Sequence, residues 1–236
     1  MQNTIATIKS ITNSKYLDII GVVLVVGVSV YLEYYKTTYD FSFDGKNYSF
    51  YLGYFSFLNT CLSMIATRLV TKKNNIGNLI STCNTLLSGS IDYLLGNIGA
   101  ILTYPISFFG NYFAFQIWKK KQYLNAIDVI FFRNMAIGLL LSFVLNYIAF
   151  TSFSDKAIDW KLFFAIAIPA GISFGGTFNI GRMYPDNWIN WQVYNLFKII
   201  QNVMLMNIAN TAKYVFYMFN AILGYITWRD DKKMQL

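Results

Sequence analysis

The stretch that decides the fold is DNWINWQVYN at residues 186–195, the start of a tract that closes with GYITW at residues 224–228. Its polar and aromatic residues recur at intervals of three or four and therefore share one face of a helix. Together with the residues that follow, this face carries Trp188, Trp191, Asn195, Lys198 and Asn202. Because polar groups are costly in hydrocarbon, such a face normally lies against protein or a water-filled cavity. The stretch predicts a membrane helix that helps to hold a flat, neutral or weakly charged solute.

The composition of the whole chain is that of a membrane protein. Of its 236 residues, 56% are hydrophobic and 19% aromatic, but only 13% are charged, whereas soluble domains carry about 25% charge. Long apolar segments separated by short polar breaks predict transmembrane helices. We predict an all-α polytopic membrane protein with about eight such helices, at residues 16–35, 50–70, 76–92, 96–118, 127–150, 160–181, 188–206 and 209–228.

The basic residues predict how the chain is oriented. The net charge is +8, but the lysines and arginines cluster between apolar segments, which favours membrane loops over nucleic-acid binding. With a cytoplasmic N-terminus, twelve basic residues fall in inside segments and four in outside segments, as the positive-inside rule requires. We therefore predict a multi-pass protein of the plasma (inner) membrane, with both termini cytoplasmic. Its partners include the lipid bilayer and exclude nucleic acid.

An internal repeat predicts the domain organisation. Residues 74–118 and 186–228 both open with an acidic or amide residue plus Asn, run through two spans and end in a Trp followed by charged residues. Adding the preceding span to each gives two three-helix repeats, 50–118 and 160–228, with a linker helix in residues 119–159. One intervening span makes the repeats parallel, as in the 3+1+3 arrangement of SWEET sugar carriers. Residues 1–49 then form an extra N-terminal span with an extracellular loop, and residues 229–236 a cytoplasmic tail.

The candidate site combines the polar residues of corresponding spans. Asn78, Ser81, Thr85, Ser88 and Asp92 have the same spacing in the first repeat as the stripe that begins at Trp188. Hydroxyl residues also join membrane helices, and tryptophans also form interfacial belts, so these alternatives stay open. Lys198 needs a partner or a polar cavity, and its position in the repeat makes Asp92 the candidate. The predicted substrate-binding residues are Asn78, Asn84, Tyr104, Asn111, Trp188, Trp191, Asn195, Lys198, Tyr217 and Asn220.

Several absences narrow the function. The chain has no histidine, and Cys61 and Cys83 have no paired spacing, so we predict no metal site and no cofactor. No nucleophile–base pair and no phosphate-binding GxxxxGK[ST] loop is present, which argues against an enzyme. Pro105 and Pro169 are predicted to interrupt their spans and form hinges. Gly171 and Gly175 form a GxxxG motif that predicts close helix packing.

The motif W-x-x-W-x-x-x-N at Trp188, Trp191 and Asn195 resembles that of the PnuC-type vitamin transporters. The terminal segment from Asn220 through Trp228 and the first-repeat stretch from Asn75 to Trp118 are also similar. The resemblance covers roughly residues 50–228. It implies a homotrimer of 3+1+3 subunits in which Trp188, Trp191 and Asn195 contact the substrate near the centre of the membrane.

The resemblance also implies a transport function. The expected substrate is a vitamin-type nucleoside, foremost nicotinamide riboside, carried by facilitated diffusion with alternating access and trapped inside by a cytoplasmic kinase. The alternatives within the family are thiamine, riboflavin and deoxynucleosides. Outside the family, a ligand-binding receptor, a membrane enzyme and a structural membrane subunit stay open. Lys198, Gln201 and Pro105 depart from the family pattern and leave the substrate undecided.

Overall fold

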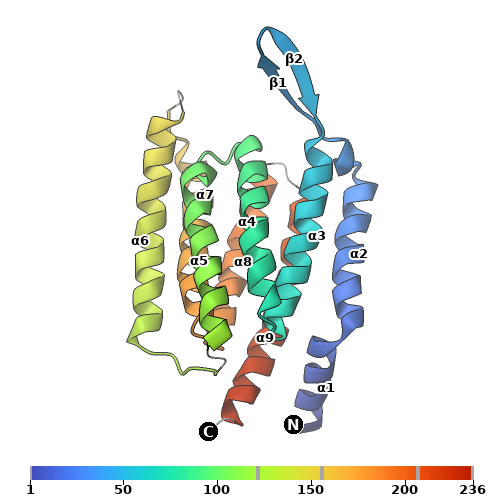
Figure 1. Cartoon of the computed structure of the whole chain (residues 1–236), viewed down its shortest axis with the longest axis vertical. Coiled ribbons are helices and arrows are strands. Elements are labelled where there is room, and N and C mark those ends of the chain that lie inside the picture. The colour runs from blue at the N-terminus through green and yellow to red at the C-terminus, as the bar shows by residue number, and fades with distance from the viewer. Residues whose placement is uncertain (1, 121–122, 155–156, 206–207, 235–236) are drawn as a thin grey trace.

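Each of the eight predicted segments forms a helix in the computed structural model, which describes residues 2–120, 123–154, 157–205 and 208–234 (Figure 1). Most helix ends lie within a few residues of the predicted limits, and the last helix continues beyond residue 228. The helices are α2 (Lys15–Tyr31), α3 (Leu52–Thr71), α4 (Ile76–Leu94), α5 (Ala100–Lys120), α6 (Val129–Ser152), α7 (Trp160–Ile180), α8 (Asn187–Met204) and α9 (Ile208–Lys233).

The N-terminal region contains a further helix that the sequence analysis missed. Helix α1 (Gln2–Asn13) precedes α2 and meets it at an angle of 55°. The bend falls at Ser14, whose side chain caps α2 by accepting a hydrogen bond from the backbone N–H of Tyr16. Serine favours this capping position because its hydroxyl satisfies a backbone donor that has no partner inside the helix. The predicted span at residues 16–35 corresponds to α2 alone, and α1 joins it at this capped break to form an elbow.

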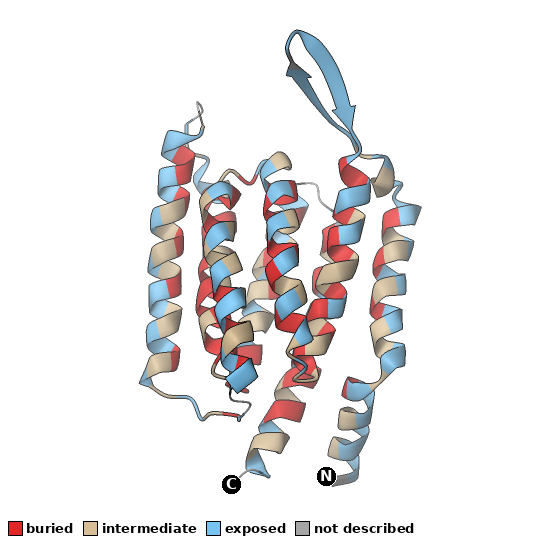
Figure 2. Ribbon diagram, in the orientation of Figure 1, coloured by how far each residue is buried: buried red, intermediate tan, exposed pale blue. Residues whose placement is uncertain are grey.

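The predicted extracellular loop contains a β-hairpin. After a 3₁₀ turn at Tyr34–Lys36, strands β1 (Tyr39–Phe43) and β2 (Lys46–Phe50) pair antiparallel. The two residues between them, Asp44 and Gly45, have φ values of 51° and 69°, which two-residue hairpin turns favour. The Asp-Gly pair between alternating aromatic and polar residues is a hairpin signal that the sequence analysis did not use. The hairpin projects from the bundle and is exposed (Figure 2).

Six helices form a closed ring. Helices α3, α4 and α5 pack in succession, as do α7, α8 and α9, and the ring closes through contacts of α5 with α7 and of α9 with α3. Helix α6 packs outside α7, while α2 packs outside α3 and α9. The hairpin marks one end of the ring and both chain termini lie at the other (Figure 1). We call these the hairpin end and the termini end.

Hydropathy alone identifies fewer membrane spans than the ring contains. In the described residues, α6 and α7 are long and apolar enough to cross a membrane by that standard, and the bent pair α1–α2 would make a third span. Helix α8 falls short because it carries Asn195, Lys198 and Asn202, all of which are buried inside the ring. The polar residues that lower the hydropathy of such helices are therefore those that face the interior.

The glycine prediction is confirmed and the proline prediction is wrong in part. A Cβ added at Gly138 of α6 would lie 2.5 Å from the backbone nitrogen of Gly175 and 2.7 Å from the carbonyl oxygen of Gly171. The GxxxG motif therefore brings the backbones of α6 and α7 together, as small residues do in membranes. Pro105 and Pro169, by contrast, lie inside α5 and α7 without ending either helix. The predicted interruption of these two spans is not observed.

Candidate functional site

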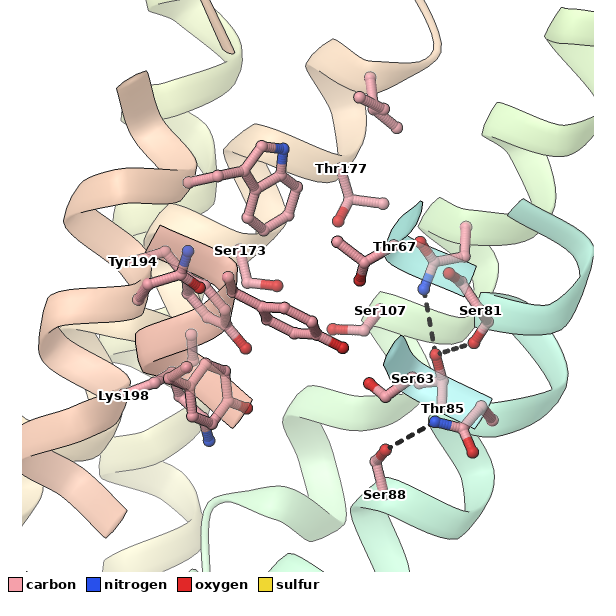
Figure 3. A pocket seen from close by; sticks show the side chains of 18 of the residues that line it. Ser63, Thr67, Ser81, Thr85, Ser88, Ser107, Ser173, Thr177, Tyr194 and Lys198 are labelled. Atoms are coloured by element: carbon pink, nitrogen blue, oxygen red, sulfur yellow. Dashed lines mark hydrogen bonds between the residues drawn. The ribbon is translucent and has the colours of Figure 1, made fainter. Parts of the chain in front are cut away.

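The ring encloses a cavity of about 210 Å³ (Figure 3). A single water molecule needs about 10–15 Å³ of such space, so the cavity accommodates a small organic solute. All ten residues predicted for the site line it: Asn78, Asn84, Tyr104, Asn111, Trp188, Trp191, Asn195, Lys198, Tyr217 and Asn220. The structure thus brings them together from α4, α5, α8 and α9. Their contact with a substrate stays a prediction.

The lining residues follow a constant numerical offset. Adding 110 to the number of each lining residue on α3, α4 or α5 gives a lining residue on α7, α8 or α9. On α3 and α7 the chemistry is the same at each pair: Ser63 and Ser173, Thr67 and Thr177, Val70 and Ile180. Tyr104 and Tyr214 are also identical, whereas the remaining pairs differ, and the lining residues of α4, α5, α8 and α9 form two walls.

The first wall is small and polar. We call the lining residues of α4 and α5 the polar wall: Asn78, Ser81, Asn84, Thr85, Ser88, Thr103, Tyr104, Ser107 and Asn111. The second carries rings and cations. We call the lining residues of α8 and α9 the aromatic wall: Trp188, Trp191, Tyr194, Asn195, Lys198, Gln201, Lys213, Tyr214, Tyr217, Asn220 and Ala221. Figure 3 shows Ser81, Thr85 and Ser88 on one side of the cavity and Tyr194 and Lys198 on the other.

The polar wall is held in place by its own hydrogen bonds. Asn111 of α5 donates to the hydroxyl of Thr85 at 3.0 Å, and Thr85 donates to a backbone carbonyl of its own helix. Ser88 donates to the amide oxygen of Asn59 on α3 at 2.5 Å. These hydroxyls join helices, as the alternative interpretation held, and they also line the cavity. The side-chain oxygen of Asn84 is buried without a partner among the described residues, so it can accept a hydrogen bond from a solute.

The two tryptophans of the motif occupy space that glycines leave open. A Cβ at Gly176 would lie 3.2 Å from the ring of Trp191, and one at Gly224 would lie 2.7 Å from that of Trp188. Trp188 is 2% exposed, which rules out an interfacial belt position for it. Its indole N–H has no hydrogen-bond partner among the described residues. The aromatic wall therefore offers a free donor beside flat rings.

Asn195 lies between these rings and the cations of the same wall. Its side chain is 3% exposed and lines the cavity, and it makes no hydrogen bond with another described residue. Trp191 packs edge-on against Tyr194 with ring centroids 5.4 Å apart, which orients the tryptophan next to Asn195. A buried amide without a protein partner is expected to bind water or solute. The side-chain amide of Asn195 is thus available to hydrogen-bond a solute in the cavity.

Asn220 differs, because both ends of its amide are occupied. Its oxygen accepts from Arg68 at 2.6 Å, and its nitrogen donates to the hydroxyl of Thr71 at 2.8 Å. Arg68, which is buried, also pairs with Asp18 of α2 at 2.7 Å. Although Asn220 lines the cavity, its hydrogen bonds serve to hold the N-terminal elbow on the ring. The sequence analysis did not identify Arg68, because it lies among other basic residues at a span end.

At the hairpin end, an ion pair joins the two walls. The Lys198 ammonium lies 3.3 Å from a carboxylate oxygen of Asp92 on α4, and the Tyr104 hydroxyl donates to the same oxygen at 2.5 Å. The pairing of Lys198 with Asp92, which the sequence analysis offered from the repeat alone, is confirmed. Because Asp92 belongs to α4 and Lys198 to α8, separating the two sets of helices at this end breaks the pair.

At the termini end, two tryptophans each donate a hydrogen bond to the opposite set of helices. Trp118, near the end of α5, donates to the carbonyl of Ile180 at 2.8 Å, and Trp228, on α9, donates to the carbonyl of Thr71 at 2.8 Å. Ile180 and Thr71 end α7 and α3, so each donor bonds a helix of the other set. Their rings meet with centroids 6.0 Å apart. The ring is therefore closed at this end by a nearly symmetric contact.

The sequence analysis missed several residues of the cavity. The most consequential is Lys213 of α9, which is 3% exposed and lines the cavity. Others are Tyr194 and Tyr214 on the aromatic wall and the matching Ser and Thr residues of α3 and α7. The signal that identifies the two tyrosines is the offset of 110, since Tyr104 predicts Tyr214 and Asn84 predicts position 194. Lys213 has its counterpart in Thr103, which was not itself predicted, so this test would not have found it.

Comparison with known proteins identifies similar ones. A family profile described as nicotinamide mononucleotide transporter matches residues 53–230. A solved structure, the crystal structure of the vitamin B3 transporter PnuC, has the same fold, with a TM-score of 0.70 and 13% sequence identity over 94% of each chain. No curated protein sequence matches significantly. The profile covers the whole ring, from α3 through most of α9.

Proposed function

The chain belongs to the nicotinamide mononucleotide transporter family, and we propose that it carries a vitamin-type nucleoside across the plasma membrane by facilitated diffusion. Nicotinamide riboside is the substrate that the motif resemblance favours, and the name of PnuC as a vitamin B3 transporter supports it. Thiamine, riboflavin and deoxynucleosides are the alternatives. Family and fold are those of a transporter rather than an enzyme.

The observation that carries this proposal is the difference between the two walls. The aromatic wall presents flat rings and the amide of Asn195, which suit a planar heterocycle. The polar wall presents hydroxyls and the unpartnered oxygen of Asn84, which suits the hydroxyl donors of a sugar. A nucleoside has a flat ring at one end and a sugar at the other. It therefore fits across the cavity in one orientation.

Alternating access follows from the bonds that join the two sets of helices. We assign α3–α5 and α7–α9 as the parallel repeats 50–118 and 160–228, with α6 as the linker of residues 119–159. Opening the hairpin end breaks the pair of Lys198 with Asp92, and opening the termini end breaks the bonds of Trp118 and Trp228. Rocking about the cavity opens one end while the other stays closed. Pro105 and Pro169 lack a backbone donor and offer points of flexion.

The proposed function includes an orientation in the membrane, a trapping enzyme and an oligomeric state. The positive-inside count supports a cytoplasmic termini end and an outside hairpin, with residues 1–49 as an added elbow and hairpin and residues 229–236 as a tail. A cytoplasmic kinase traps the product, which keeps the inward gradient. The assembly is a homotrimer, as the family resemblance implies.

Uptake by reconstituted protein tests the proposal. Full-length protein in liposomes is given labelled nicotinamide riboside, thiamine, riboflavin or a deoxynucleoside, and uptake is followed to equilibrium. We expect one of them to equilibrate across the membrane without a driving ion gradient. Wild-type protein that is folded but transports none of the four would overturn the function.

Two variants test the site within the same assay. Trp191→Ala and Asn195→Ala should abolish uptake without changing the folded yield. Trp160→Ala is the matched control, because Trp160 is the first residue of α7 and is 54% exposed. This variant should transport normally. Normal uptake by both site variants would remove these residues from the site while leaving the transport function intact.

A further inference from the structure

The charges around the cavity do not balance. Lys198 and Lys213 line it, and Asp92 is the single buried carboxylate among the described residues. Two cations and one anion leave one positive charge uncompensated. All three residues lie toward the hairpin end, since Asp92 and Lys198 belong to the last turns of α4 and α8, and Lys213 to the first turns of α9.

Asp92 is already committed to Lys198. One of its oxygens accepts from both the Lys198 ammonium at 3.3 Å and the Tyr104 hydroxyl at 2.5 Å. Lys198 sits on the α8 stripe facing α4, so this pair bridges the cavity walls. Lys213, in contrast, has no carboxylate within ion-pair distance among the described residues. The charge without a direct partner is therefore that of Lys213.

No described group around Lys213 supplies the missing negative charge. Its side chain is 3% exposed, so it cannot extend its ammonium to outside solvent as lysines near helix ends usually do. Its ammonium lies 4.7 Å from the ring of Tyr214, while that of Lys198 lies 5.7 Å from the same ring. A ring shared by two cations stabilises each less than an anion would. A buried cation in this setting calls for an anionic partner.

The cavity itself is where that partner can come from. Lysine is a compact point charge that binds carboxylate and phosphate oxygens, and Lys213 is one of the residues that line the cavity. Thr103 occupies the corresponding position of the polar wall, 110 residues earlier. The cation is thus a feature of the aromatic wall, where the flat ring of the solute is expected to lie.

We infer that the transported solute carries an anionic group that binds Lys213 at the hairpin end of the cavity. The inference rests on the proposed function and narrows it. A nucleoside with a cationic ring and no anion, such as nicotinamide riboside, adds to the uncompensated charge, whereas a ring carboxylate or a sugar phosphate offers Lys213 an anionic oxygen to bind. The shared chemistry is an anionic oxygen group on a vitamin-type nucleoside or nucleotide.

A set of three matched compounds tests the inference and separates the two sources of the anion. Nicotinamide riboside and nicotinic acid riboside differ only in a carboxamide against a carboxylate, and nicotinamide mononucleotide adds a phosphate to the first. Binding to purified full-length protein is followed by tryptophan fluorescence. We expect one anionic compound to bind at least tenfold more tightly than nicotinamide riboside, and its identity shows whether the group is a carboxylate or a phosphate.

Substitutions of Lys213 test whether this residue causes the preference for an anionic compound. Lys213→Thr, which installs the residue of the corresponding position, should lower affinity for the preferred anion at least tenfold without weakening nicotinamide riboside. Lys233→Gln, at an exposed position of the tail, should bind all three as the wild type does. Lys213→Met is the second variant, and both are first checked for thermal unfolding, so that a folding defect is recognised.

The outcomes separate the inference from the proposed function. Equal or tighter binding of nicotinamide riboside in the wild type overturns the inference alone, as does a preference for the anion that survives in folded Lys213→Thr or Lys213→Met. Failure of the wild type to bind these three compounds and the panel of the uptake assay overturns the proposed function and the inference together.

Discussion

The polar wall and the aromatic wall occupy corresponding positions of two sets of three helices, yet they share few side chains. Where α4 has Ser81 and Ser88, α8 has Trp191 and Lys198. By contrast, the lining residues of α3 and α7 match at each pair, and the bonds of Trp118 and Trp228 at the termini end mirror each other. The lining of α3 and α7 and the contact at the termini end are therefore nearly symmetric, whereas the polar and aromatic walls are not. A symmetric frame suits a rocking motion, and an asymmetric surface holds a solute in one orientation.

The ion pair that joins the two walls gives the largest expected effect. Asp92→Asn removes the buried partner of Lys198 and leaves two cations in the cavity. Breaking a buried pair by removing one partner costs about 3–5 kcal/mol, so we expect a large loss of stability. Thermal and denaturant unfolding of the purified protein in detergent measures it, with Asp40→Asn on the exposed hairpin as the control. Wild-type stability in Asp92→Asn would show that the pair does not join the walls energetically.

Giving the two walls the same residue at one position should weaken binding of the solute, with a smaller change in free energy than the loss of the ion pair. Trp191→Ser gives the aromatic wall the residue of Ser81. Stacking of a base on an aromatic side chain is worth about 1–3 kcal/mol, so affinity for the transported solute should fall by about fivefold to a hundredfold. Titration of the protein with the solute by calorimetry measures the change. An unchanged affinity would mean that the solute ring lies elsewhere in the cavity.

The symmetric contact at the termini end should respond symmetrically. Trp118→Phe and Trp228→Phe each remove one indole hydrogen bond to a helix-end carbonyl of the other set. A hydrogen bond of this kind contributes about 0.5–1.5 kcal/mol, and we expect the two variants to lose similar stability. Unfolding in detergent compares them, and the double variant tests their coupling through the ring contact. A loss confined to one variant would contradict the symmetry of this contact.

A carboxylate that precedes the first residue of α6 gives the smallest effect and a contrast with Asp92. Asp128 caps α6 and accepts from the Tyr184 hydroxyl at 2.7 Å, which lowers the pKa of its carboxyl below the ordinary value of 3.8. A lowered pKa contributes stability above the ordinary value, and this is lost as the pH falls through the lowered one. The unfolding temperature of the wild type should therefore fall between about pH 5 and pH 3 by slightly more than that of Asp128→Asn. Parallel curves would show that the hydrogen bond from Tyr184 to Asp128 makes no measurable contribution to stability.

Much of the fold was predictable because its main determinants are local in sequence. Runs of apolar residues gave the eight helices, and the spacing of the motif around Trp191 and Asn195 gave the face that lines the cavity. The elbow at Ser14 and the hairpin turn at Asp44 and Gly45 were missed although their signals are also local. Those errors came from reading residues 1–49 as one span and a loop, and not from missing information.

The remaining parts of the site depend on contacts between distant segments. Lys213 shares one face of α9 with Tyr217 and Asn220, but its burial beside the cavity follows only from how α9 packs between α8 and α3. The amide of Asn220 belongs to the predicted site by pattern, yet its partners Arg68 and Thr71 lie about 150 residues away in sequence. Sequence spacing cannot show whether an amide is occupied or free.

The sequence by itself determined the membrane class, the helices and which face of each is polar, because hydropathy and helical periodicity are properties of neighbouring residues. The tertiary structure decided which polar groups meet and which stay unpartnered: Asp92 with Lys198, Arg68 with Asn220, and Lys213 without a carboxylate in the described part of the chain. Pairing depends on distances between helices, which close packing sets only when the whole ring is assembled.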